Sequence, residues 1–235
     1  MWGNKLSHFY HLLKTHNIRT TLANPVGWLQ ENGYPVRGII SCLNSPTERL
    51  AGFIDHFLQP GMKSLETFLQ DTKHTLQIIS QLNDKIENGE LSLDGVNLVS
   101  LDVNKMYNNI TEDLGKSACR QYLDSRAVVG TQTESCKVKT PTLMEGLDLC
   151  IKNNFFTYNG KIYRQIGGVG TGVKLAPPYA CIAMGEYENQ VFSSQNEMLK
   201  LIGIWKRFID DIFILFKGSK EDCDLKYPMF SLYNH

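Results

Sequence analysis

The chain has 235 residues, of which 42% are hydrophobic and 20% are charged, and its 24 basic side chains equal its 24 acidic ones. This composition excludes a disordered chain and supports one large domain or two small ones with a buried core. The net charge of zero gives no support for nucleic-acid binding through bulk charge, so any basic track must be local.

The cysteines and the apolar runs narrow the class of protein further. Six cysteines are scattered without CxxC pairs, which indicates reduced intracellular thiols and neither a disulfide framework nor a zinc site. No run of about 18 apolar residues occurs, and the first residues do not resemble a signal peptide, so we expect no membrane partner.

The N-terminal part of the chain shows turns and two helical patterns. Residues 1–20 contain a short amphipathic piece, and residues 24–45 are rich in turn-forming residues. A helix is predicted over 45–61, with Ser45 as its N-cap, a glutamate at the capping-box position, and a Pro-Gly pair that ends it. The spacing of apolar residues predicts a second helix over about 63–82.

Strand and hairpin signals dominate the second half. The stretch 96-VNLVSLDV-103 alternates as a strand does and ends close to Asp102. The Asn-Gly pair within 155-FFTYNGKIYRQ-165 predicts a hairpin with a type I′ turn. An order of strands and helices without regular alternation favours an α+β fold over a doubly wound sheet. Helices are predicted over about 111–126, 141–153 and 177–192.

Two adjacent aspartates, Asp210 and Asp211, interrupt the apolar run 207-RFIDDIFILF-216, which reads as strand, tight turn, strand. Two such charges about 4 Å apart repel by about 4 kcal/mol at an effective dielectric of about 20. If the strand that ends at Asp102 lies beside this hairpin, three carboxylates converge, and hard oxygen ligands of this kind bind Mg²⁺ or Mn²⁺. Two such ions can activate a hydroxyl and stabilise a leaving pyrophosphate. The alternative is an ordinary solvated turn.

Several stretches in a fixed order resemble one family. A strand with Asp-x₄-Tyr, a Gly-rich stretch that opens a helix, and Phe-x-Asp-Asp in a hairpin resemble a reverse transcriptase, and the details resemble the Penelope-like retroelement family. The matching stretches are 9-FYHLLKTHN-17, 33-GYPVRGIISCLNSP-46, 98-LVSLDVNKMYNNI-110, 163-YRQIGGVGTGVKLAPPYACIAMGEYE-188 and 205-WKRFIDDIFILFKG-218.

This resemblance implies a right-hand polymerase fold, α+β, with an antiparallel sheet and packed helices. Residues 1–95 would form a fingers-like region and residues 96–235 a palm, with a fingers-type insertion near 127–165. The residues that follow 216 are too few for a thumb, so the thumb is expected to be absent and the palm incomplete at its C-terminus.

The resemblance also implies the catalytic residues. Asp102, Asp210 and Asp211 would be catalytic, and Asp102, the Val103 carbonyl and Asp210 would hold two Mg²⁺ (or Mn²⁺) ions, with Asp211 as the second acid of the doublet. Tyr107 would place its ring against the sugar 2′ position and so favour deoxynucleotides. An ordinary aromatic residue at a helix entry is the alternative for Tyr107.

The remaining site residues are implied by their places in the motifs. Arg is the side chain whose planar fork suits phosphate oxygens, so a fingers arginine is expected on the triphosphate. Solvated surface charges and ordinary loop glycines are the alternatives. The nucleotide-binding residues would be Arg37, Lys14, Gln165 and Gly172, beside Tyr107, and the template- or primer-binding residues would be Gly168 and Lys174.

The implied activity is that of an RNA-directed DNA polymerase of a retroelement. A primer 3′-hydroxyl would attack the α-phosphate of a dNTP, with an RNA template, a DNA primer and two metal ions as partners. The element's life cycle implies an intracellular, nuclear protein. A catalytically inactive polymerase remnant that binds nucleic acid or protein is the second hypothesis, and an RNA-dependent RNA polymerase is the third.

Overall fold

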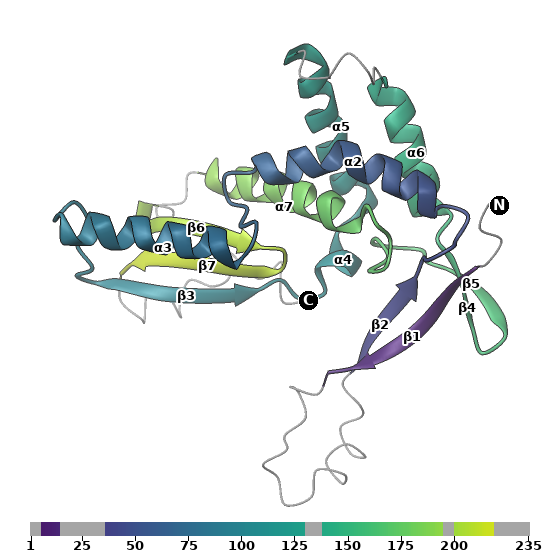
Figure 1. The fold of residues 1–235 in the computed structure, drawn as a ribbon, viewed down its shortest axis with the longest axis horizontal. Helices are drawn as coiled ribbons and strands as arrows, with labels where there is room; N and C mark the ends of the chain where they lie inside the picture. Colours follow the sequence, from purple (N-terminus) through teal and green to yellow (C-terminus); the bar gives the residue numbers. More distant parts are fainter. Residues whose placement is uncertain (1–5, 15–35, 130–137, 195–199, 219–235) are drawn as a thin grey trace, which may run out of the picture.

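The protein forms a helical centre flanked by two separate β-sheets, as the computed structural model in Figure 1 shows. The structure describes residues 6–14, 36–129, 138–194 and 200–218. Helices and strands mix along the chain without regular alternation, so the predicted α+β class is confirmed.

The first half of the chain supplies β1 (Ser7–Leu13), β2 (Val36–Ser41), α2 (Glu48–Ser64), α3 (Thr72–Glu87), β3 (Val96–Asp102), α4 (Met106–Asn109) and α5 (Glu112–Val129). The second half supplies α6 (Thr140–Lys152), β4 (Phe155–Tyr158), β5 (Lys161–Arg164), α7 (Ala176–Phe192), β6 (Ile202–Phe208) and β7 (Asp211–Lys217). Figure 1 shows α2 and α7 in the centre, β3, β6 and β7 to one side, and β1, β2, β4 and β5 to the other.

Helix α7 is the centre of the hydrophobic core. Its small face, made of Ala176, Ala180 and Ala183, is fully buried, which lets neighbouring helices approach closely. On α5, a Cβ added at Gly115 would lie 2.1 Å from the Tyr179 ring, so this contact requires the absence of a side chain. Helices α2 and α5 therefore pack directly on α7.

The three-stranded sheet has the order β3-β7-β6 and is antiparallel throughout. Its strands alternate: Ile212, Ile214 and Phe216 of β7 are buried in the core, and the residues between them lie on the other face. That other face borders the first turn of α3, where a cavity of about 290 Å³ is lined by Thr72, Phe213 and their neighbours.

The four-stranded sheet has the order β2-β1-β4-β5 and joins two distant parts of the chain. Strands β4 and β5 form the predicted hairpin, and positive φ angles of 48° at Asn159 and 72° at Gly160 confirm its type I′ turn. Strand β1 pairs antiparallel with β2 but parallel with β4. The predicted antiparallel sheet is present as the β3-β7-β6 sheet, and the four-stranded sheet adds one parallel pair, β1–β4.

The predicted boundaries of the first helix are wrong at both ends. Helix α2 begins at Glu48, and Ser45 does not cap it, because its Oγ lies 3.4 Å from Thr47 Oγ1 and the Glu48 carboxylate accepts from the Asn44 N–H instead. Pro60 lies inside α2, which continues to Ser64. The last turn persists because Gly61 packs against the Tyr122 ring of α5, and this tertiary contact outweighs the lost backbone hydrogen bond.

The second helix starts nine residues later than predicted. Helix α3 begins at Thr72, where the Asp71 side chain accepts a 2.8 Å hydrogen bond from the His74 N–H. Residues 65–69 form instead a segment that bonds to β6, with Leu69 N–H donating to the Arg207 carbonyl at 2.8 Å. Among the described residues, no helix is long and apolar enough to cross a bilayer.

Candidate active site

The β6–β7 turn brings the aspartates together. Strand β6 ends at Phe208 and β7 begins at Asp211, so Asp210 lies in the turn itself. Strand β3 runs beside β7 with Asp102 directly opposite Asp211, and side chains of such a pair share one face with Cβ atoms about 4.5–5.5 Å apart. The Val103 N–H donates a 2.8 Å hydrogen bond to the Asp210 carbonyl. The prediction that these two strands are neighbours is confirmed.

Asp211 is affected electrostatically by the other two carboxylates. Partial desolvation raises the pKa of Asp211, and the charges of Asp210 and Asp102 raise it further. Like charges directly opposite each other in a sheet are destabilising, so this arrangement lowers the stability of the chain by itself. Asp102 and Asp211 are exposed to solvent, which reduces the cost.

The donor atoms at this turn suit a hard cation. All are oxygens, from Asp102, Asp210, Asp211 and the Val103 carbonyl, and oxygen ligands are those that Mg²⁺ and Mn²⁺ prefer. Within the described ranges, no three His, Cys, Asp or Glu side chains converge closely enough to hold a metal ion in this conformation. The chemistry of the residues fits the predicted metal site, and the site itself stays a prediction.

The turn that carries Asp210 is conformationally strained. Ile209 has a φ of 56°, in the left-handed region that β-branched residues rarely enter. This conformation costs about 1–2 kcal/mol. Contacts around the turn must therefore hold Ile209 in place.

Tyr107 lies beside this turn and is hydrogen-bonded to the glycine-rich loop, the segment that contains Gly167, Gly168, Gly170 and Gly172. It belongs to α4, and its carbonyl accepts a 2.8 Å hydrogen bond from the Val169 N–H. Burial raises the pKa of Tyr107 to about 12, with a further increase from the charge of Asp210 and a decrease from that of Arg37. Arg37 and Asp210 therefore both act on the Tyr107 hydroxyl, although they lie far apart in the sequence.

The glycine-rich loop connects Tyr107 to β2. Gly168 has a φ of 64°, and a Cβ there would lie 2.4 Å from the Tyr107 carbonyl oxygen. A Cβ at Gly172 would lie 1.9 Å from the Ile40 carbonyl oxygen of β2, the strand that carries Arg37. Both glycines thus permit close approach to the chain's own backbone, and their contact with a nucleotide or template stays a prediction.

Two other predicted binding residues, Lys174 and Gln165, have side-chain partners within the structure. Lys174 is exposed, and its Nζ lies 3.8 Å from a Glu48 carboxylate oxygen. The Gln165 amide accepts from Asn154 Nδ2 at 2.8 Å and donates to the Gly167 carbonyl at 2.8 Å. The Gln165 side chain thus links Asn154, the residue before β4, to the glycine-rich loop, and its role toward a nucleotide stays a prediction.

Lys14 follows the last residue of β1, beside the strand that carries Arg37. Leu12 is the register partner of Arg37, so Lys14 lies two residues beyond that pair. A basic pair at this edge of the sheet is consistent with the predicted triphosphate contact, which stays a prediction.

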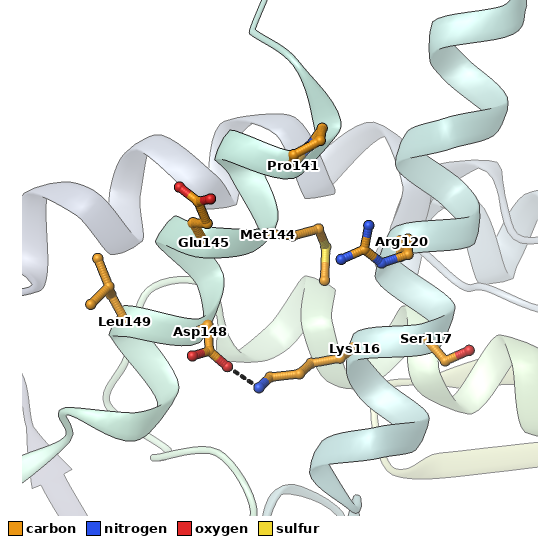
Figure 2. Close-up of a pocket in the computed structure, with 8 residues that line it drawn as sticks. All are labelled: Lys116, Ser117, Arg120, Pro141, Met144, Glu145, Asp148 and Leu149. Carbon is orange, nitrogen blue, oxygen red and sulfur yellow. Dashed lines mark hydrogen bonds and ion pairs between the residues drawn. The ribbon is translucent and has the colours of Figure 1, made fainter.

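Among the hollows outside the aspartate turn, two border helices α4, α5 or α6. One of about 460 Å³ is bordered by α4, β5 and the glycine-rich loop, with Asn108, Arg164 and Gly168 in its lining. The other, of about 620 Å³, lies between α5 and α6, where Lys116 pairs with Asp148 (Figure 2). The second hollow has no residue in common with the predicted motifs, so its size alone does not make it the functional site.

Two buried charged residues escaped the sequence analysis. Arg207 of β6 is 0% exposed and Glu188 of α7 is 2% exposed, and the two form an ion pair with Nε and Oε1 2.6 Å apart. The two-residue period of β6 could have revealed Arg207. It lies two residues after Trp205 and so shares the core face, whereas Lys206 and Phe208 lie on the opposite face.

Comparisons with known proteins show the fold. No protein-family model and no curated protein matches the chain. Telomerase from Candida tropicalis, in complex with a fragment of telomeric RNA, matches with a TM-score of 0.56 and 12% identity over 78% of this chain and 31% of that one. The corresponding telomerase complex from Candida albicans matches with a TM-score of 0.53 and 12% identity over 79% of this chain and 32% of that one. Apo telomerase from Candida tropicalis matches with a TM-score of 0.52 and 15% identity over 80% of this chain and 33% of that one.

The chain spans about a third of the length of these telomerase chains. At such low identity the likeness shows the fold alone. The described residues thus share their fold with part of these telomerase chains.

Proposed function

We propose that the chain is the polymerase part of a reverse transcriptase, an RNA-directed DNA polymerase that transfers a nucleotide from a dNTP to a primer 3′-hydroxyl. One observation carries the proposal: Asp102 lies opposite Asp211 in register, and Asp210 occupies the turn beside them. The telomerase-like fold supports it. The fingers, with residues 1–95, and the palm, from residue 96 on, are part of the same proposal.

The proposed roles follow from the chemistry of each side chain. Asp102, Asp210 and the Val103 carbonyl would hold two Mg²⁺ or Mn²⁺ ions, which activate the primer hydroxyl and stabilise the leaving pyrophosphate. Tyr107 would pack its ring against the sugar and exclude a 2′-hydroxyl. Arg37, whose charge acts on Tyr107, would bind phosphate oxygens with its planar guanidinium.

The proposed partners are an RNA template, a DNA primer and dNTPs. Two of the telomerase structures contain RNA, which supports a nucleic-acid partner for this fold. The order of the motifs supports the Penelope-like branch, and a nuclear location would follow from the life cycle of such an element.

Primer extension tests the proposal. The chain would receive an RNA template, a DNA primer, dNTPs and Mg²⁺ or Mn²⁺, as wild type, Asp102→Asn and Asp94→Asn. Asp94 is a matched control, because it is exposed and precedes the opposite end of β3 from Asp102. A lost catalytic electrostatic contact costs about 10²–10³-fold in rate, so we expect at least that loss for Asp102→Asn and none for the control.

Each other outcome has a defined meaning. Equal extension by wild type and Asp102→Asn would show that the site is wrongly assigned. RNA binding that is indifferent to Mg²⁺ and to Asp102, without incorporation, would support the binding-module hypothesis. Preference for ribonucleotides would support an RNA polymerase and refute the role of Tyr107.

A further inference from the structure

Arg207 is a fully buried guanidinium whose donors reach two separate parts of the fold, helix α7 and the β6–β7 turn. Nε and Nη2 donate to the two carboxylate oxygens of Glu188 at 2.6 and 3.2 Å. Nη2 also donates to the Cys181 carbonyl of α7 at 3.2 Å, and Nη1 donates to the Ile209 carbonyl at 3.1 Å. A buried charge is tolerated only when it is paired and hydrogen-bonded, and Arg207 meets that condition.

Glu188 holds the guanidinium in one orientation. Besides Arg207, its carboxylate accepts from Trp205 Nε1 at 3.0 Å and from Thr67 Oγ1 at 2.6 Å, so both oxygens have two partners. Burial alone would lower the pKa of Arg207, but the hydrogen bonds and the charge of Glu188 outweigh it and raise that pKa. The Arg207 guanidinium is therefore charged, and its two bonds to Glu188 fix its orientation.

The fourth bond of Arg207 reaches the strained turn. Ile209, with its φ of 56°, immediately precedes Asp210. The peptide groups before and after Asp210 are thus both held: Arg207 Nη1 donates to the Ile209 carbonyl at 3.1 Å, and the Val103 N–H donates to the Asp210 carbonyl at 2.8 Å. A guanidinium fork supplies this geometry, and an ammonium group does not, because it lacks the second nitrogen.

We propose that Arg207, oriented by Glu188, is a positioning residue that holds Ile209 in its left-handed conformation and thereby sets where Asp210 lies relative to Asp102. The placement of the turn stands on the contacts alone, and its consequence for polymerisation rests on the proposed function. Glu188 belongs to α7 and Asp102 to β3, so the pair links the core helix to the proposed metal-binding turn.

The test separates this placement from general stability. The double variant Arg207→Met with Glu188→Gln removes both buried charges, while the new amide can still accept from Trp205 Nε1 and donate to Thr67 Oγ1. Replacing a buried ion pair in this balanced way is often neutral for stability. Lys116→Met with Asp148→Asn removes an ion pair between α5 and α6 and is the matched control.

Amide hydrogen exchange, measured residue by residue by NMR, reports the turn without metal, nucleotide or activity. In the double variant we expect exchange of the Val103 amide to accelerate by about tenfold or more, because its acceptor moves with the turn. The Val169 amide, which bonds to the Tyr107 carbonyl at 2.8 Å, serves as an internal reference and should not change. Neither amide should respond in the control variant.

Arg207→Lys gives a second route if the double variant does not fold. It keeps a cation beside Glu188 but lacks the Nη1 donor, so Val103 exchange should accelerate there too. Unchanged Val103 exchange in whichever of these variants folds would overturn the proposal. Primer extension then tests the consequence: accelerated exchange with a lower kcat at unchanged KM supports it. Accelerated exchange in a chain whose wild type does not extend primers would leave the placement standing and refute only the proposed function.

Discussion

Alanine at Gly172 should separate the glycine-rich loop from β2. Its Cβ would lie 1.9 Å from the Ile40 carbonyl oxygen and 2.9 Å from the Ile40 carbonyl carbon, and real Cβ contacts are essentially never shorter than 3.0 Å. Both neighbours are backbone atoms, which cannot rotate away as a side chain can. The loop and β2 must therefore move apart by about 1 Å for the variant to fold.

The expected loss has a part in stability and a part in activity. Overpacking of this kind costs about 1–3 kcal/mol. In a domain of this size each kcal/mol lowers the unfolding midpoint by about 2–4 °C. Strand β2 carries Arg37, so the same displacement moves a proposed phosphate ligand, and misplacement by about 1 Å can cost about 10²-fold in rate.

Gly167→Ala in the same loop is the control, because a Cβ there would meet nothing within 4 Å. Urea and thermal unfolding measure the loss of stability, and primer extension measures the loss of rate. We expect Gly172→Ala to fall in both assays and Gly167→Ala to stay close to wild type. Wild-type stability and rate for Gly172→Ala would refute the reasoning, because they would mean that the loop does not contact β2.

Three further predictions concern other parts of the structure. Asp211→Asn should raise the thermal midpoint of the metal-free chain. This gain in stability over wild type should grow as the pH rises from the unfolded pKa of 3.8 through the raised pKa of folded Asp211, because wild type loses stability as Asp211 ionises. A gain that is equal at all pH values would contradict the electrostatic cause. Burial raises the pKa of Cys119 and Cys150 to about 12, so neither thiol should react with iodoacetamide at neutral pH in the folded chain, as mass spectrometry can show; fast labelling would contradict their burial. Leu58→Ala, at a side chain that is 0% exposed, should cost about 2–5 kcal/mol in urea unfolding, against about 0.5 kcal/mol or less for the exposed Leu76→Ala; equal costs would contradict the packing of α2.

Local chemistry was enough to predict several elements. The period-2 alternation of residues 96–103 predicted β3, and the Asn159-Gly160 pair predicted the β4–β5 hairpin. The N-terminal acids of α5 and the Pro residues at the starts of α6 and α7 marked those helices. These signals act within a few residues of the chain, so they can be read without knowing what the segment packs against.

Predictions failed where a distant contact overrode the local signal. Pro60 did not end α2, because packing of Gly61 on Tyr122 stabilises the turn after it. The apolar residues after α2 did not form a helix, because their backbone pairs with the backbone of Arg207. The Arg207 N–H donates to the Thr67 carbonyl, and the Arg207 carbonyl accepts from the Leu69 N–H. Strand β2 was not predicted within its turn-rich stretch. Its pairing partner β1 is distant in the sequence, because residues 14–35 separate the two strands.

The sequence by itself determined that a carboxylate pair lies in a tight turn and that a strand ends in a third aspartate, because alternation and turn chemistry are local properties. Only the tertiary structure decided that Asp102 faces Asp211, that the charge of Arg37 acts on Tyr107, and that a buried Arg207 donates to the Ile209 carbonyl of the turn. Register, close backbone approach and a buried ion pair depend on residues far apart in the chain, and those distances are set when the elements pack together.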